Sequence, residues 1–210
     1  MITKELLQEV PQDEIVINVS FDLRKLYLIP FAYIYLKINY PKIVKIFITQ
    51  NNSNYGEILG LEKFRSRIDL SRYNVLTYIH SKGVTKPNSK PVSDWRALMR
   101  YFIMHKYDDA IKVFARGYEL YGVNLFREDE NPANKNMYAF RHSKYIYRGN
   151  FIILNLDKLR SKLCTVTIDR DYYSVEGLWG KLTTIDKAYN AHSSSISHYN
   201  YEYPSEKYIL

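Results

Sequence analysis

The stretch EIVINVS at residues 14–20 decides the fold class. It is mostly apolar and rich in β-branched residues, the composition of a strand buried on both faces of a parallel sheet. Two similar runs follow it, IVKIFIT at residues 43–49 and NVLTYI at residues 74–79. The segments between them, residues 22–35 and 56–68, predict helices. The chain therefore begins strand–helix–strand–helix–strand, which predicts an α/β fold with parallel strands and right-handed crossovers.

The rest of the chain predicts a mixed set of elements. After a polar linker at residues 86–91, Ser93 or Asp94 is expected to cap a helix, and Gly117 to end a second one. Further helices are expected at 108–116, 157–162 and 175–182, and strands at 118–125, 150–154 and 164–168. We expect a single domain at residues 1–185, with a mixed, mostly parallel sheet flanked by helices. For the tail at 186–210, packing onto the active site and fraying both stay open.

Composition limits the class of protein. The 210 residues are 46% hydrophobic, which is enough apolar surface for a packed core. No apolar run reaches the roughly eighteen residues of a membrane-spanning helix, and residues 1–5 lack the start of a secretory signal. We therefore expect a cytoplasmic protein without a transmembrane segment. The single cysteine, Cys164, excludes an internal disulfide, and its apolar neighbours predict a buried, inert thiol.

The formal net charge of +8 predicts an anionic partner: nucleic acid, acidic lipid headgroups or a nucleoside diphosphate. Lysine and arginine are spread along the whole chain rather than gathered on one helix, which argues against a dedicated nucleic-acid binder. The alternative to an enzyme is a basic module that binds RNA or another polyanion. In such a module the 21 tyrosines, interleaved with lysine and arginine, would stack on bases.

Ligands of open α/β sheets bind beyond the carboxyl ends of the strands, so the loops at residues 18–22, 50–54 and 80–85 are the candidate binding loops. Ser20 lies in the first loop, and Asn51 in the second is suited to hydrogen bonding a base or ribose. In the third, His80-Ser81-Lys82-Gly83 offers a ring nitrogen, a hydroxyl, a positive charge and a glycine that lets the backbone approach a phosphate closely. An ordinary strand exit explains the same residues equally well.

Several short motifs, taken in order, resemble a known family. They are YIHSKGVT at residues 78–85, DWR at 94–96, MRYF at 99–102, YGVN at 121–124 and GNF at 149–151. The chain resembles a family of glycosyltransferases found in bacteria and large DNA viruses, similar to rhamnosyltransferases of the rhamnan-synthesis type. The resemblance covers about residues 14–182. It implies a GT-A fold, with a Rossmann-like nucleotide-binding half at about 14–116 and an acceptor half at about 117–185.

The resemblance also implies a hexosyltransferase that moves a sugar, rhamnose being one option, from a nucleoside diphosphate to a hydroxyl of a glycan or glycoprotein. Arg96 would add a bidentate contact to the diphosphate. The segment Gly149-Asn150-Phe151 would lie on the acceptor side. Glu176, Asp171 and Asp169 are the candidate general bases, with Glu176 preferred because it matches the family's E-x-[LW]-W pattern. Acids at the start of a helix also favour the helix dipole without any catalytic role.

Metal dependence stays open at this point. Many GT-A enzymes hold Mn²⁺ or Mg²⁺ on the diphosphate with an Asp-x-Asp pair after a central strand, where this chain has His80 and Lys82. Lys82 would replace the metal's charge in a metal-independent transfer. Alternatively, His80 is itself a ligand, or His198 in the tail supplies one.

Overall fold

The parallel pair expected at the start of the chain is present. A computed structural model describes residues 2–8, 10–52, 54–81, 86, 88–130 and 138–209. Strand β1 (Ile15–Phe21) pairs in parallel with β2 (Ile43–Gln50), with Phe21 opposite Gln50 at their carboxyl ends. The crossover between them is a 3-10 segment (Leu23–Leu28) followed by helix α2 (Ile29–Asn39). Pro30 lies in the first turn of α2, where its missing N–H costs no helical hydrogen bond.

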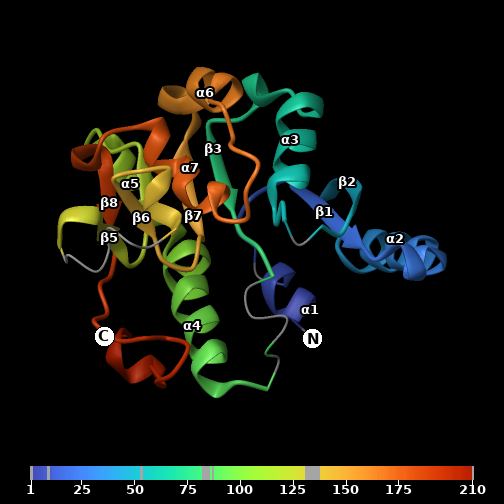
Figure 1. Cartoon of the computed structure of the whole chain (residues 1–210), viewed down its shortest axis with the longest axis horizontal. Helices are drawn as coiled ribbons and strands as arrows, with labels where there is room; N and C mark the ends of the chain where they lie inside the picture. The colour runs from blue at the N-terminus through green and yellow to red at the C-terminus, as the bar shows by residue number, and fades with distance from the viewer. Residues whose placement is uncertain are drawn as a thin grey trace.

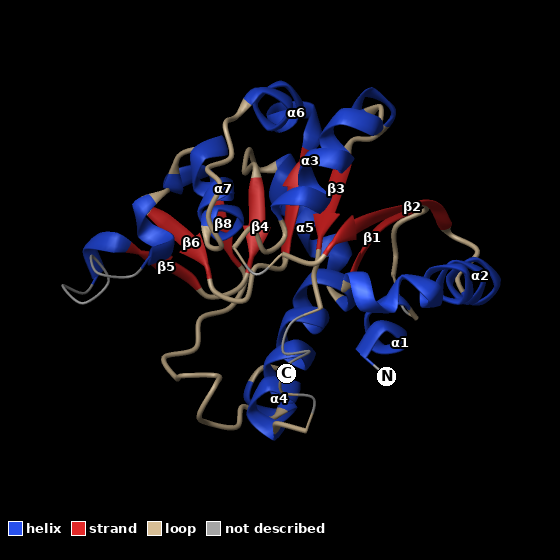
Figure 2. Cartoon of the chain, turned by 45° about the vertical axis from the view of Figure 1, so that its right-hand side comes forward, coloured by secondary structure: helices blue, strands red, loops and turns tan. Residues whose placement is uncertain are grey.

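The next strand departs from the expectation of a mostly parallel sheet. β3 (Val75–Tyr78) pairs antiparallel with β7 (Ile152–Asn155), which also pairs antiparallel with β4 (Leu120–Gly122). β8 (Ala188–Asn190) lies parallel to β4, so the order in this sheet is β3-β7-β4-β8. Within the described residues, two strand pairs are parallel and three antiparallel, the fifth being β5 (Leu125–Arg127) with β6 (Tyr145–Tyr147). The protein is therefore α/β with mixed sheets (Figure 2).

Helices cover both faces of the four-stranded sheet (Figure 1). On one face, Leu120, Ile152 and Leu154 pack in a cluster with residues of α3, α6 and α7. On the other, Tyr121 and Ile153 pack with α4, α5 and the C-terminal segment. The alternation along β4 and β7 gives each face its own core. The remaining helices are α1 (Ile2–Leu7), α3 (Ile58–Arg67), α4 (Lys90–Arg100), α5 (Tyr107–Ala115), α6 (Leu156–Thr165) and α7 (Ser174–Leu182), with a π-helical turn (Tyr101–His105) joining α4 to α5.

Two expectations for the region after β7 are wrong. Residues 164–168 do not form a strand, because α6 continues to Thr165, whose hydroxyl donates to the carbonyl of Ser161 at 2.9 Å. Cys164 therefore lies on the outer side of this helix and is exposed rather than buried. The expectation failed because successive side chains of a helix point in directions about 100° apart, so Leu163 is buried while Cys164 is exposed.

The described tail, residues 186–209, packs on the body of the protein. β8 extends the sheet beside β4, and the 3-10 turn Ser205–Lys207 contacts α4. Tyr208 is buried among Tyr101, Phe102 and His192. None of the helices in the described parts of the chain is both long enough and apolar enough to cross a membrane.

Candidate functional site

One edge of the four-stranded sheet brings together segments that are far apart in the sequence. Because β3 and β7 are antiparallel, the residues that follow β3 lie beside those that precede β7. His80 therefore meets the segment Gly149-Asn150-Phe151. β4 and β8 also have their carboxyl ends at this edge, so Asn124 reaches it from β4. We call it the carboxyl edge.

His80 is held by contacts from two sides. Its Nδ1 atom contacts a carboxylate oxygen of Glu57, and its Nε2 atom lies 2.9 Å from the carbonyl oxygen of Gly149. The ring also meets the edge of Phe151, with ring centroids 5.7 Å apart. Both ring nitrogens therefore face oxygen atoms, and these contacts fix the orientation of the ring.

Glu57 is the centre of the arrangement, and the sequence analysis missed it. It stands immediately before α3, after Gly56, which has a positive φ of 50°. Its second carboxylate oxygen accepts hydrogen bonds from the hydroxyl of Tyr78 at 2.5 Å and from Nδ2 of Asn150 at 3.1 Å. Asn150 in turn accepts one from the indole nitrogen of Trp179 at 2.5 Å. We call Glu57, Tyr78, His80, Asn150 and Trp179 the Glu57 network.

The backbone at Asn150 explains how a buried amide reaches two partners. Gly149 and Asn150 both have positive φ, 94° and 60°, so the chain turns sharply just before β7. Asparagine is among the few side chains that tolerate this conformation. The turn places an almost fully buried amide between Glu57 and Trp179, where both of its ends are satisfied.

Glu176 belongs to the same region. It lies in the first turn of α7, one helical turn before Trp179, so the two side chains share a helix face. Burial raises the pKa of Tyr78 well above its usual value, and the negative charges of Glu57 and Glu176 raise it further. Glu176 acts on the pKa of Tyr172 in the same direction, although burial is again the larger cause. Tyr78 is thus a neutral donor between two carboxylates.

The other two acidic candidates are engaged in a separate cluster. His142 lies between them, with Nδ1 2.8 Å from Asp169 and Nε2 2.5 Å from Asp171. The ammonium of Lys181 lies 2.6 Å from Asp169, and that hydrogen bond is the main reason that the pKa of Asp169 is lowered. Asp171 also accepts from the backbone N–H of Tyr173 at 2.9 Å at the start of α7. These contacts tie both carboxylates to His142, Lys181 and the start of α7.

Arg96 is placed differently from the expectation of a diphosphate contact. Its side chain is only 3% exposed, and its Nε atom lies 3.5 Å from a carboxylate oxygen of Glu5 in α1. Its neighbour Trp95 packs at the carboxyl edge instead. The indole lies so close to Gly149 that a Cβ on that glycine would be 3.1 Å from the indole nitrogen. Burial against Glu5 leaves Arg96 a role in holding α1 to α4.

His198 shows that the tail also reaches the carboxyl edge. Its ring is stacked on Trp95, with centroids 5.2 Å apart, and its Nε2 atom lies 2.5 Å from the hydroxyl of Ser194 and 3.3 Å from the amide of Asn124. Burial lowers the pKa of His198 to about 4, and the positive charge of Arg148 adds to that effect. The neutral ring is therefore favoured.

The described residues do not fit a divalent cation. Mn²⁺ and Mg²⁺ prefer carboxylate and carbonyl oxygens to the ring nitrogens of histidine. In addition, both nitrogens of His80 already face protein oxygens, and Nε2 of His198 faces Ser194 and Asn124. Within the described residues, no group of three or more His, Cys, Asp or Glu side chains is arranged to hold a metal ion.

Of the remaining expected binding residues, Asn51 and Ser81 follow β2 and β3, but Ser20 lies within β1 rather than in a loop beyond it, because the strand continues to Phe21. Ser20 forms a hydrogen bond with Thr49 at 3.0 Å, across β1 and β2, and Asn51 is exposed after β2. Ser81 is exposed directly after His80. Lys82 and Gly83 lie outside the described residues, so their predicted role stays a prediction.

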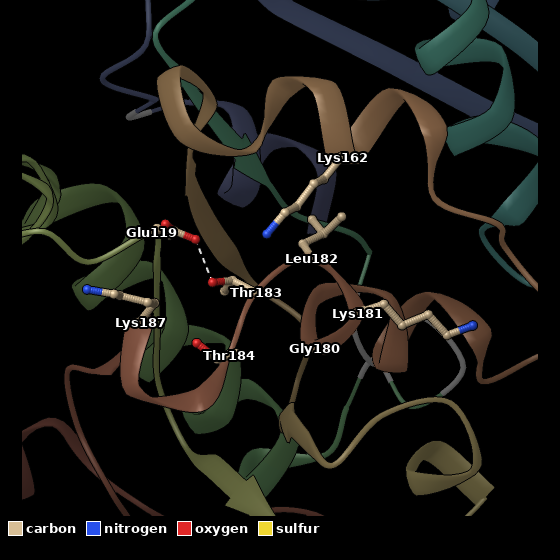
Figure 3. A pocket seen from close by; sticks show the side chains of 8 residues that line it. All are labelled: Glu119, Lys162, Gly180, Lys181, Leu182, Thr183, Thr184 and Lys187. Atoms are coloured by element: carbon tan, nitrogen blue, oxygen red, sulfur yellow. Dashed lines mark hydrogen bonds between the residues drawn. The ribbon is translucent and has the colours of Figure 1, made fainter.

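A cavity of about 470 Å³ lies at the opposite edge of the sheet (Figure 3). Glu119, which precedes β4, accepts a hydrogen bond there from the hydroxyl of Thr183 at 2.5 Å. Three lysines, Lys162, Lys181 and Lys187, are among the other residues that line the cavity. None of the residues expected to bind or react lines this cavity, so the carboxyl edge is the better candidate site.

No family model, curated protein or solved structure matches the chain. The site therefore has to be interpreted from its own chemistry.

Proposed function

We propose that the protein is a glycosyltransferase that binds a nucleoside-diphosphate sugar at the carboxyl edge and transfers the sugar to a hydroxyl group of a glycan or glycoprotein. One observation carries the proposal: Glu176 and the Glu57 network lie together at His80, which Ser81, Lys82 and Gly83 follow directly in the sequence. This edge is where α/β sheets bind ligands, and the motif resemblance supports the GT-A type of fold and a rhamnosyl donor.

The reaction needs a base and a way to stabilise the leaving group. Glu176 is our candidate base: its carboxylate takes the proton from the acceptor hydroxyl as that oxygen attacks the anomeric carbon. The bond from that carbon to the diphosphate breaks, and the diphosphate leaves with the electron pair. Lys82 and the Ser81 hydroxyl would stabilise its negative charge.

His80 and Glu57 act as positioning residues in this proposal. Both nitrogens of His80 face protein atoms, so in this proposal the ring fixes the position of Ser81 rather than contacting phosphate itself. Glu57 is likewise committed to Tyr78, His80 and Asn150, so we assign it no role as the base.

Nucleotide-sugar binding is the first test. Melting of the full chain is measured with UDP-, GDP- and dTDP-sugars, dTDP-rhamnose included, with and without Mn²⁺. At least one donor should raise the melting temperature. Lys82→Ala should weaken binding about tenfold or more, because a charged hydrogen bond to phosphate is lost. Lys158→Ala on α6, an exposed lysine, is the matched control and should bind normally.

Transfer is tested separately from binding. Glu176→Gln should keep donor affinity and lose transfer by a factor of about 10² to 10⁴, the usual contribution of a general base. Full activity in that variant would exclude Glu176 as the base. The whole proposal fails if no nucleotide sugar binds, and salt-dependent oligonucleotide binding in that case would favour the polyanion-binding alternative.

A further inference from the structure

Helix α2 and the 3-10 segment before it form the most apolar exposed surface in the described part of the chain. Nine of its sixteen exposed large hydrophobic side chains lie between residues 23 and 38. Phe31 is 70% exposed and Ile38 is 73% exposed. The nine are Leu23, Leu26, Tyr27, Leu28, Phe31, Tyr33, Ile34, Tyr35 and Ile38. Gathered apolar side chains of this kind mark a docking surface rather than ordinary scatter.

Four of the exposed apolar residues of α2 make one continuous stripe. Phe31, Ile34, Tyr35 and Ile38 are spaced as i, i+3, i+4 and i+7, which places them on one helix face. Leu36 points the other way and is buried in a small cluster with Tyr40 and Ile43. α2 thus has two apolar faces, one packed on the protein and one open. It lies beyond β2, projecting from the rest of the molecule (Figure 1).

Charge decides between the possible occupants of this surface. From residue 23 to residue 56 the sequence has no aspartate or glutamate, and its five basic residues are Arg24, Lys25, Lys37, Lys42 and Lys45. Arg24 is paired with Asp22, just outside this stretch, at 2.6 Å. A second copy of the chain would bring the same positive charges against these. An anionic lipid surface would be attracted by them.

We propose that α2 and the 3-10 segment Leu23–Leu28 dock the protein on an anionic membrane surface. α2 has 11 residues, too few to cross a bilayer, but its apolar face is suited to lie in the interface with the headgroups. Three exposed tyrosines of this surface, Tyr27, Tyr33 and Tyr35, are of the type enriched at that depth. Lys37 and Lys42 donate to backbone carbonyls of the protein, so Arg24, Lys25 and Lys45 are the basic residues that we expect beside lipid phosphates. This inference does not depend on the proposed glycosyl transfer.

Vesicle binding of the full chain tests the proposal. The probes are phosphatidylcholine vesicles with and without phosphatidylglycerol, separated by flotation. We expect binding to the anionic vesicles about tenfold or more above that to the neutral ones, weakening as salt is added. The double variant Phe31→Asp/Ile38→Asp should lose about tenfold or more of the binding.

The matched control changes exposed apolar residues elsewhere. Tyr201→Asp/Ile209→Asp alters side chains that are 64% and 46% exposed and lie in the tail, and it should bind vesicles like the unchanged protein. Circular dichroism and thermal melting establish that each variant is folded. The proposal is overturned if neither vesicle is bound, or if the two double variants bind equally. It is also overturned if the chain sediments as a dimer that the Phe31→Asp/Ile38→Asp change dissociates without any vesicle binding.

Discussion

Gly149 and Gly117 have nearly the same backbone conformation, with φ of 94° and 96°, but very different surroundings. A Cβ on Gly117 would meet nothing within 4 Å, whereas one on Gly149 would overlap the buried sulfur of Met99. Gly117→Ala should therefore cost only the backbone strain, about 1 to 3 kcal/mol. Gly149→Ala should cost about 1 to 3 kcal/mol more because of overpacking. Chemical denaturation of both variants measures the difference, and equal losses would show that Gly149 is not crowded by Met99.

Single residues also show how far the candidate site could be predicted. His80 and Asn150 were placed correctly at strand ends because apolar runs locate those ends directly. Glu57 was missed because a glutamate before a helix is ordinary, and nothing local signals its contacts with His80, 23 positions later, and Asn150, 93 positions later. Asp169 and Asp171 show the converse. The resemblance made them candidate bases, but the sequence did not reveal that His142, 27 positions before Asp169, contacts both of them.

At the scale of elements, the first crossover was predictable and the main sheet was not. β1, α2 and β2 follow one another, and a connection that is long enough to hold a helix is the crossover that a parallel pair needs. β3 has the same kind of apolar run, but its partner β7 comes 77 positions later in sequence and runs the other way. A strand buried on both faces looks the same in either direction, so its pattern carries no information on the sense of pairing.

The tail provides a prediction at this scale, since its last turn is held to α4 and the π-helical turn by aromatic packing. Tyr208 is 8% exposed and its ring centroid lies 5.4 Å from that of Tyr101, while the next residue, Ile209, is 46% exposed. Tyr208→Ala should lower the free energy of unfolding by about 3 kcal/mol through the cavity that it leaves. Ile209→Ala should change it by less than about 0.5 kcal/mol. If equilibrium denaturation finds both variants neutral, the tail does not stabilise the fold.

For the whole molecule, the packed tail makes stability depend on pH in a definite window. His198 has a pKa of about 4 in the folded protein, against an ordinary value of 6.5, chiefly because it is buried between Trp95 and the Ser194–Asn124 pair. Burial lowers the pKa of His192 as well. Between pH 6.5 and about 4 the unfolded chain is protonated at His198, whereas the folded protein is not. The free energy of unfolding therefore falls as the pH decreases from 6.5 to about 4.

The size and origin of this dependence can be measured separately from other titrations. A pKa lowered from 6.5 to about 4 corresponds to a loss of up to about 3 kcal/mol, since each pKa unit is worth about 1.4 kcal/mol. The carboxylates contribute mainly at lower pH, because Asp169, whose pKa is lowered from 3.8, loses its stabilising charge only below that value. His198→Gln should be less stable at neutral pH, but its free energy of unfolding should depend much less on pH between 6.5 and 4. In the unchanged protein, the imidazole resonance of His198 should titrate near pH 4. An unchanged slope in the variant, or a resonance that titrates at its ordinary value, would mean that the tail does not bury His198 at the carboxyl edge in solution.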